Sequence, residues 1–352
     1  MIDWSKSMTQ TFEYYTVDTG TWKDDKKINN VKKSAITRDL ETDTLGSSTI
    51  DIVDTIGEKY VRTYLIAKQN GNTYKIPLGT HLVQSPSTTF DGFTKNVSMD
   101  AYTPIIELKE NQPPIGYSLL KGTNIMSTAY QICRENMRAP IVIANSDDTL
   151  YQDFISNTND TWVTFITDLI SNAKYELDLD ELGRVLFKPK QDTASLQPVW
   201  TYTDDNSSIL YSDITIDQDL YGIPNIVEVT YSNGSDFFYK KVINDDPNSP
   251  LSIANRGRKI IHRVNNPNLL GDPTKYQIDE YANQLLRDLS SLEYTVSYKH
   301  GYCPVRLGDC VRLNYSRAGL NNIKAKVINQ TINCEAGCTV TEKAVFTVKL
   351  WG

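Results

Sequence analysis

The run Val61-Arg62-Thr63-Tyr64-Leu65-Ile66-Ala67 is followed by Asn70-Gly71-Asn72 and then by Tyr74-Lys75-Ile76-Pro77-Leu78. Both runs are rich in β-branched and aromatic residues, which favour strands. An Asn-Gly dipeptide accepts positive φ at little cost, so the stretch predicts an antiparallel hairpin. Further strand-like runs lie at residues 11–17, 48–53, 79–85 and 95–102. Short strands at this spacing predict a small β-barrel or sandwich over residues 1–105.

The middle of the chain, residues 106–195, has a different pattern. It follows a breaker that contains Pro113 and Pro114. Thr123 or Asn124 can cap a helix whose apolar face includes Cys133, which we expect to be a small core residue. Residues 162–173 have the periodicity of a strong amphipathic helix, and residues 175–180 and 185–189 have that of a β-hairpin. This segment is therefore predicted to be an α+β domain.

The last segment, residues 196–352, is again mainly β. Strand-like runs at 226–231 and 237–242 flank an Asn233-Gly234 turn, and four more lie at 294–298, 311–315, 324–328 and 344–350. One long helix, about 272–291, is predicted to begin at Asp272 or Thr274. The fold class is thus mainly β with α+β: two β domains flank the α+β domain, and the second carries a helical insert.

Composition limits the classes of function. A net charge of −7 over 352 residues argues against a general nucleic-acid binder, although an acidic wall past which DNA slides stays possible. The 21 tyrosines, against 9 phenylalanines, suit strands at interfaces. The N-terminus lacks the pattern of a signal peptide, and no apolar run is long enough for a membrane helix. We therefore expect folding in the cytoplasm.

Four of the five cysteines fall near the C-terminus, as the pairs Cys303 and Cys310, and Cys334 and Cys338. Thiolates are soft ligands, so these four could hold an iron–sulfur cluster or a zinc ion in a structural site. Disulfides or free thiols are the alternative. His300 could be a neighbour or a substitute ligand of this site, or a surface or strand-end histidine.

The sequence contains no motif of an enzyme. A nucleophile elbow, a phosphate loop, an HExxH motif and a dinucleotide fingerprint are all missing. Asp178, Asp180 and Glu181 are candidate catalytic carboxylates, but a solvated strand face explains them without chemistry. A basic cluster could meet an acidic subunit or DNA, although ordinary surface charge also accounts for it; its members are Arg256, Arg258, Lys259 and Arg263.

Several stretches resemble phage tail hub proteins of contractile tails and of phage-like bacteriocins. They are residues 35–40 (AITRDL), 45–48 (LGSS), 74–86 (YKIPLGTHLVQSP), 100–104 (DAYTP), 107–111 (ELKEN), 114–117 (PIGY), 134–140 (RENMRAP) and 301–309 (GYCPVRLGD). The resemblance covers most of the chain. It implies that residues 1–105 and 196–352 are tube-like β-barrel domains, and that three chains form a pseudo-sixfold ring.

The same resemblance implies a function and partners. The chain would be a structural baseplate hub that adapts a hexameric tail tube to a trimeric spike or tip, and it would contact other baseplate proteins. It would belong to the virion tail, assembled in the bacterial cytoplasm, with no membrane embedding and with DNA at most passing through the lumen. The competing hypothesis is a tail-associated peptidoglycan hydrolase.

The cysteine pattern has a resemblance of its own. Cys303, Cys310, Cys334 and Cys338 are similar to the four cysteines in the minor tail protein at the hub of long non-contractile tails, where they hold a [4Fe–4S] cluster. This likeness implies a [4Fe–4S] cluster here, with zinc as the alternative. The gaps between the cysteines differ from those of that protein.

Overall fold

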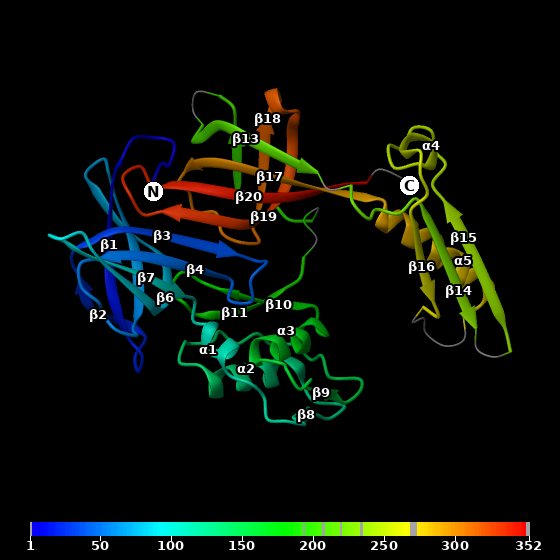
Figure 1. Cartoon of the computed structure of the whole chain (residues 1–352), viewed down its shortest axis with the longest axis horizontal. Coiled ribbons are helices and arrows are strands. Elements are labelled where there is room, and N and C mark those ends of the chain that lie inside the picture. The colour runs from blue at the N-terminus through cyan, green and yellow to red at the C-terminus, as the bar shows by residue number, and fades with distance from the viewer. Residues whose placement is uncertain are drawn as a thin grey trace. The chain divides into compact units, whose positions relative to one another are not determined.

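A computed structural model describes residues 2–191, 193, 195–205, 208–218, 220–232, 235–267 and 273–349 (Figure 1). The chain forms two compact units. The first comprises Met1–Ile214 and Ser297–Ala344, and the second comprises Thr215–Val296 and Val345–Gly352. Strands predominate over helices, as the sequence predicts. Among the described residues, none of the helices is long and apolar enough to span a bilayer.

The N-terminal strands form the first half of a large sheet, in the order β3-β4-β7-β6-β5-β1-β2. The predicted hairpin is confirmed: β5 and β6 are antiparallel, and Asn70 and Gly71 have positive φ between them. β5 is buried on both faces over most of its length. The strands are β1 (Thr9–Asp18), β2 (Lys23–Ile28), β3 (Val31–Asp39), β4 (Gly46–Ile52), β5 (Tyr60–Gln69), β6 (Asn72–Phe90) and β7 (Lys95–Tyr102).

The C-terminal strands continue this same sheet. β19 pairs with β3 in antiparallel register, with Ile332 opposite Ile36, so the first and last β segments share one hydrogen-bonded sheet. Both isoleucines are fully buried in a core cluster with Leu65, Leu78 and Val340. The added strands are β12 (Trp200–Thr203), β13 (Leu210–Gln218), β17 (Ser291–Gly301), β18 (Cys310–Tyr315), β19 (Leu320–Asn333) and β20 (Thr339–Lys349).

The middle segment has the predicted α+β character. Its helices are α1 (Ile106–Glu110), α2 (Ile125–Asn136) and α3 (Trp162–Ser171), and β10 (Tyr175–Leu179) pairs with β11 (Val185–Pro189). β8 (Ser118–Leu119) pairs with β9 (Phe154–Ile155). The Asn124 side chain caps α2, and Thr161 caps α3. Cys133 is completely buried between these helices, which confirms its assignment as a core residue.

The second unit is a small sheet covered by one helix. β14 (Ile226–Ser232) pairs antiparallel with β15 (Phe237–Ile243) and parallel with β16 (Ile261–Asn265). α5 (Lys275–Leu289) packs Ile278, Ala282 and Leu286 against the sheet, and α4 (Ile253–Arg256) is a single turn. Thr274 caps α5 in a capping box. The predicted turn at Asn233 and Gly234 and the alternative cap Asp272 lie outside the described residues.

The predicted helical insert is therefore larger than the sequence indicates. The pattern of the sequence singled out one helix at about 272–291, whereas the unit also contains β14, β15 and β16. β14 and β15 match the strand-like runs that the sequence assigns to the second β domain, because local alternation does not show which sheet a strand joins, and β16 has no counterpart among the predicted strands.

Candidate functional site

The turn between β10 and β11 is held against the N-terminal strands by hydrogen bonds. The backbone carbonyl of Leu182 accepts from Trp22 Nε1 at 2.8 Å and from Arg62 Nη2 at 3.0 Å. The hydroxyl of Thr80 donates to the carbonyl of Glu181 at 3.3 Å. At Gly183, φ is +75°, and a Cβ would lie 2.8 Å from the Cβ of Thr80. The turn thus fits its site only with glycine at this position.

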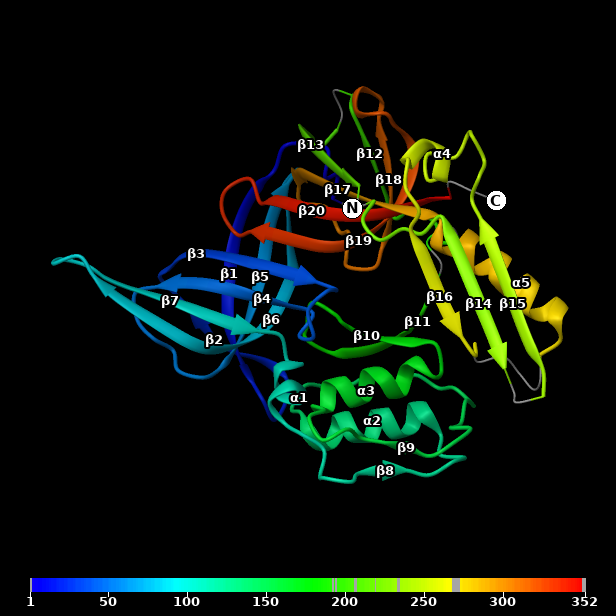
Figure 2. The ribbon, with the colours of Figure 1, turned by 45° about the vertical axis from the view of Figure 1, so that its right-hand side comes forward.

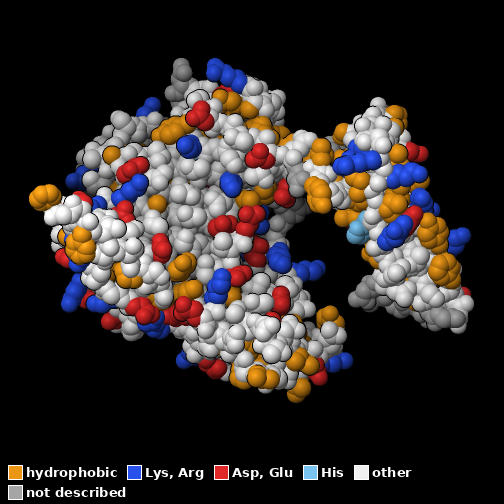
Figure 3. Space-filling model, viewed as in Figure 1, with side chains coloured by type: hydrophobic (Ala, Val, Ile, Leu, Met, Phe, Trp, Pro, Cys, Tyr) orange, Lys and Arg blue, Asp and Glu red, His pale blue; other side chains and the backbone are white. Residues whose placement is uncertain are grey.

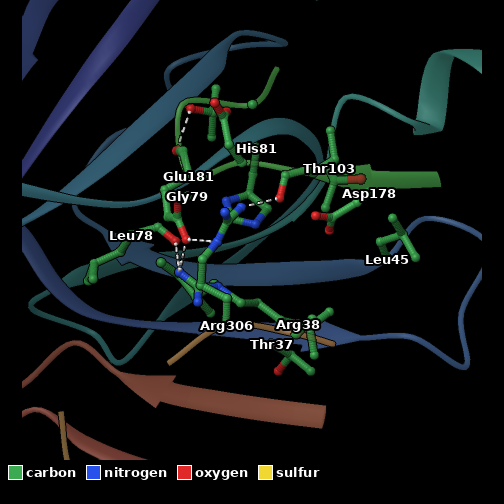
Figure 4. A pocket seen from close by; sticks show the side chains of 16 residues that line it. Thr37, Arg38, Leu45, Leu78, Gly79, His81, Thr103, Asp178, Glu181 and Arg306 are labelled. Atoms are coloured by element: carbon green, nitrogen blue, oxygen red, sulfur yellow. Dashed lines mark hydrogen bonds and ion pairs between the residues drawn. The ribbon is translucent and has the colours of Figure 1, made fainter. Parts of the chain in front are cut away.

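The side chain of Glu181 lies between two arginines from distant parts of the chain (Figure 4). Arg306 Nε is 2.7 Å from Glu181 Oε1, and Arg38 Nη2 is 3.6 Å from the same oxygen. Arg38 also donates to the carbonyl of Leu78 at 2.7 Å and to Gln330 Oε1 at 3.1 Å. We call Arg38, Glu181 and Arg306 the arginine clamp. It joins β3, the β10–β11 turn and the segment that follows β17.

A small cavity lies beside the arginine clamp. Its volume is about 50 Å³, which suits one or a few water molecules and not a substrate. His81 lines it together with Arg38, Thr103 and Asp178, as Figure 4 shows. Burial, followed by the positive charge of Arg38, lowers the pKa of His81 to about 3, so the imidazole is neutral near pH 7. The cavity therefore offers a small, partly open space beside a neutral imidazole.

A buried polar network continues from the arginine clamp into the C-terminal strands. Gln330 Nε2 donates to Glu342 Oε2 at 2.6 Å, and Tyr298 donates its hydroxyl proton to the other carboxylate oxygen. His300 Nε2 lies 3.4 Å from Glu342 Oε2, and both side chains are inaccessible to solvent. Tyr202 completes the network, with its hydroxyl 3.1 Å from His300 Nε2.

The imidazole of His300 is charged in this network. Burial opposes the charge, but hydrogen bonds to Cys303 and Glu342 and the negative charge of Glu342 outweigh it and raise the pKa of His300 to about 10. Its Nδ1 lies 2.7 Å from the carbonyl oxygen of Gly301. In the protonated imidazole this nitrogen carries a hydrogen and donates to that oxygen. A buried imidazolium and a buried carboxylate thus neutralise each other, as buried charges generally require.

The four C-terminal cysteines have different surroundings. Cys334 and Cys338 lie in the apolar cluster of Ile36 and Leu65, and burial raises the pKa of Cys334 to about 12. Cys303 is 3.3 Å from the Tyr202 hydroxyl and 3.9 Å from His300 Nδ1. Cys310, the first residue of β18, faces a groove lined by Asp309 and Lys326.

These surroundings do not form a ready four-thiolate site among the described residues. Within the described part of the chain, which includes all five cysteines, no group of three or more His, Cys, Asp or Glu side chains could hold a metal ion. All five thiols are free and buried. The [4Fe–4S] or zinc assignment of Cys303, Cys310, Cys334 and Cys338 therefore stays a prediction. His300 is a buried neighbour of Cys303 at the end of β17.

The candidate catalytic carboxylates are engaged in ion pairs. Asp180 Oδ2 accepts from Arg184 Nε at 2.5 Å, Asp178 pairs with Lys188, and Glu181 belongs to the arginine clamp. The expectation of a solvated face is wrong for Asp178, which is only 8% exposed. Asp178 lines a groove together with Lys188, Cys310 and Lys326.

Two members of the basic cluster in the second unit, Arg256 and Arg263, have separate local partners. Arg263 donates to Glu228 at 2.8 Å, and Lys241 lies 3.3 Å from the same carboxylate. Arg256 donates to the carbonyls of Ile223 and Leu220 at 2.7 and 2.9 Å. The local structure of the unit thus accounts for the positive charges of Arg256 and Arg263 without an external partner.

The sequence did not point to Arg38, Gln330 or Glu342. For Glu342 a signal existed: Val340, Glu342 and Ala344 alternate along β20 and all face the core. A charged residue in the inward series of a strand indicates a buried partner. Arg38 and Gln330 carried no such signal, because their partners lie on strands far away in the chain.

The chain shares its fold with phage tail proteins. No protein-family model and no curated protein sequence matches it. A tail protein from Neisseria meningitidis MC58 superposes with a TM-score of 0.65 at 12% identity, over 96% of either chain. The 43 kDa tail protein of prophage MuSo2 from Shewanella oneidensis gives 0.66 at 12% identity, over 95% of this chain and 98% of that one.

A more distant likeness extends to a larger assembly. One chain of the half-lidded Francisella PdpA–VgrG complex matches with a TM-score of 0.57 at 8% identity, over 97% of this chain and 58% of that chain. The superpositions establish a common fold. Identities this low say nothing about shared functional residues. The mainly β fold that the sequence predicts is thus one that tail proteins have.

Proposed function

We propose that this chain is a structural baseplate hub of a phage or phage-derived contractile tail. Three copies form a pseudo-sixfold ring that adapts the hexameric tail tube to a trimeric spike or tip. The observation that carries the proposal is the likeness to two tail proteins over nearly the whole of both chains. A match of that extent includes the inserted second unit as well as the large sheet.

The interior of the first unit supports a structural role. The arginine clamp and the Glu342 network use charged groups to join β3, the β10–β11 turn and β17 to β20. The carboxylates that could serve in hydrolysis are paired with Lys or Arg. A rigid unit of this kind suits a ring that bears load between tube and spike, and we propose no enzymatic activity.

The proposed place between the tail tube and the spike implies the partners of the chain. They are two further copies of the chain, the tail tube protein, the spike or tip protein and other baseplate proteins. The chain would be assembled in the bacterial cytoplasm into the virion tail, without embedding in a membrane, and DNA would at most pass through the lumen. Tyrosine-rich strand faces would contribute to the contacts between copies.

Two measurements test the proposal. Mass photometry of the purified chain, together with electron microscopy of tails that carry an affinity label on it, should show a trimer and one threefold ring at the tube end. A chain that stays monomeric at micromolar concentration, in tails without such a ring, would contradict the proposal. A zymogram on purified peptidoglycan addresses the hydrolase alternative, and a clear lytic band would favour it.

A further inference from the structure

β6 and β7 continue past their neighbours as a two-stranded arm. The pairing of β5 with β6 ends at Tyr60 opposite Leu82, and that of β4 with β7 ends at Ile52 opposite Val97. β6 and β7 remain paired as far as Phe90 opposite Lys95. Residues 85–90 are all exposed and span roughly 20 Å at about 3.3 Å per residue. Figure 2 shows this arm projecting from its sheet.

The arm presents two phenylalanines at its tip. The side chain of Phe90 is 74% exposed and that of Phe93 is 101% exposed. Hydrophobic side chains are visible at the end of the arm in Figure 3. Asp91 orders the turn: it accepts from the backbone N–H of Phe93 at 3.0 Å, from that of Thr94 at 2.7 Å and from the Thr94 hydroxyl at 2.6 Å. The backbone that carries the rings is therefore ordered before a partner binds, which lowers the entropy lost on binding.

The tip also carries a negative charge. Hydrogen bonds from the Thr94 side chain and from the backbone of Thr94 and Phe93 lower the pKa of Asp91 to about 2. The carboxylate is thus ionised under ordinary conditions. Between residues 85 and 94 it is the only charged side chain, and Lys95, opposite Phe90, is paired with Asp54, so the tip itself is aromatic and anionic.

A pocket with the opposite character lies on the same unit. Its volume is about 320 Å³, and it opens beside the end of β2 and the loop that follows β4. Apolar side chains line it, namely Ile28, Ile52, Val53 and Ile56. The charged side chains that line it are Lys26, Lys27, Lys59 and Asp54, and Asp54 is paired with Lys95 at 3.4 Å. Lys27 pairs with Glu13, whereas Lys26 and Lys59 are exposed and form no ion pair within the described part of the chain.

We propose that the arm of one copy docks its two phenylalanines into this pocket of a second copy. The aliphatic floor would accept the rings, and Lys26 and Lys59 would meet the Asp91 carboxylate and the ring faces. The arm and the pocket are different patches of one surface, so the contact is heterologous and links copies head to tail into a closed ring. The inference rests on the proposed ring of copies and names the residues that join them.

Photo-crosslinking identifies the occupant of the pocket directly. Phe93→p-benzoylphenylalanine is introduced into isotopically heavy chain, which is mixed with light wild-type chain in solution and in assembled tails. Mass spectrometry should find light peptides that contain residues 26–30 or 52–59 attached to heavy position 93. The control is Ile115→p-benzoylphenylalanine, because Ile115 is 93% exposed in another part of the unit. Crosslinks from position 93 to another protein or to lipid would overturn the proposal.

Variants test the energetics of the contact. F90S/F93S on the arm and K26E/K59E at the pocket should each weaken self-association by tenfold or more, since a buried aromatic anchor often contributes a large share of binding. I115S is the matched exposed control and should change nothing. Circular dichroism melts confirm that each variant is folded.

Mixing the two defective variants gives the sharpest result. One intact arm and one intact pocket remain between them, so the mixture should form heterodimers and no closed rings. Wild-type assembly by F90S/F93S alone would overturn the arm contact and leave the hub proposal standing. A wild-type chain that never assembles, in solution or in tails, would overturn both.

Discussion

Arg38 and Glu181 meet inside the first unit, with Arg38 Nη2 3.6 Å from Glu181 Oε1. Arg38 belongs to β3 and Glu181 to the β10–β11 turn, so this contact ties the N-terminal strands to the α+β segment. Arg38 also reaches Gln330 on β19 at 3.1 Å. One guanidinium therefore connects all three parts of the chain that the sequence pattern separates.

Replacement of Glu181 should destabilise the first unit. E181Q leaves Arg38 and Arg306 without their shared anion, and the Arg38 side chain is only 13% exposed. We expect the free energy of unfolding to fall by about 1–3 kcal/mol, less than for a fully buried pair because the site is partly hydrated. Urea titration measures it. E58Q is the control, since Glu58 is exposed, and it should change stability by less than about 0.5 kcal/mol.

Stability should depend on pH through His300. Its folded pKa of about 10 lies above the ordinary value of 6.5, so its charge stabilises the fold fully below pH 6.5. That contribution is lost as the pH rises from 6.5 through 10. Urea midpoints measured between pH 6 and pH 10 should fall for the wild type. The same series on H300Q should show a flatter profile, and an equal slope in both proteins would contradict the assignment.

His81 should act in the opposite direction. Its folded pKa of about 3 lies below 6.5, so the neutral form is favoured in the fold and stability is lost as the pH falls from 6.5 towards 3. H81N should flatten the acid limb of the stability profile and leave the alkaline limb unchanged. Thermal melts from pH 4 to pH 7 compare the two proteins. An unchanged acid limb in H81N would rule out His81 as the titrating group.

Gly183 should tolerate alanine worse than another glycine of like conformation. G183A places a Cβ 2.8 Å from the Cβ of Thr80 at φ +75°, and G116A adds a Cβ at φ +77° with nothing within 4 Å. The backbone strain of about 1–2 kcal/mol is common to both variants. We expect G183A to lose a further ~1–2 kcal/mol from displacement of the turn. Equal melting temperatures for the two variants would show that the turn is not held as described.

The thiols should react only after unfolding. Cys334 and Cys338 are 6% and 0% exposed, Cys303 and Cys310 are each 2% exposed, and Cys133 is 0% exposed. Burial also raises the pKa values of Cys133 and Cys334 to about 12, so little thiolate is present near neutral pH. Ellman's reagent should label the native protein slowly and label five thiols in urea. Fast native labelling would show that these side chains are accessible.

Metal analysis tests the remaining hypothesis for the cysteines. The cysteine pattern predicts a [4Fe–4S] cluster, or a zinc ion as the alternative, bound by Cys303, Cys310, Cys334 and Cys338. Elemental analysis and the visible spectrum of protein prepared without air measure both metals on one sample. One zinc or four irons per chain, lost in a C334S/C338S variant, would confirm the four-thiolate site. A chain without either metal in stoichiometric amount would contradict it.

The parts of the fold that local sequence determines were predictable. The Asn70-Gly71 turn fixes the β5–β6 hairpin, and the apolar periodicity of residues 162–173 fixes α3. The pairing of β3 with β19 was not predictable, because Ala35 and Ile36 carry no local mark of their partners. The metal site at the four C-terminal cysteines stays a prediction. Local spacing does not show that Cys334 and Cys338 join the cluster of Ile36 and Leu65, or that Cys303 lies beside Tyr202.

The antiparallel pairing of β3 with β19 also dictates when the first unit can be completed. Asp39 finds its partner Asn329 only after about 290 further residues have been synthesised. At about 5–20 residues per second this takes roughly 15–60 s, during which one edge of β3 is an unpaired strand. Lys32 and Lys33 near the start of β3 are charges of the kind that discourage strand addition. For that period, β3 in the nascent chain can pair with β4 along one edge, while the edge that later binds β19 has no partner.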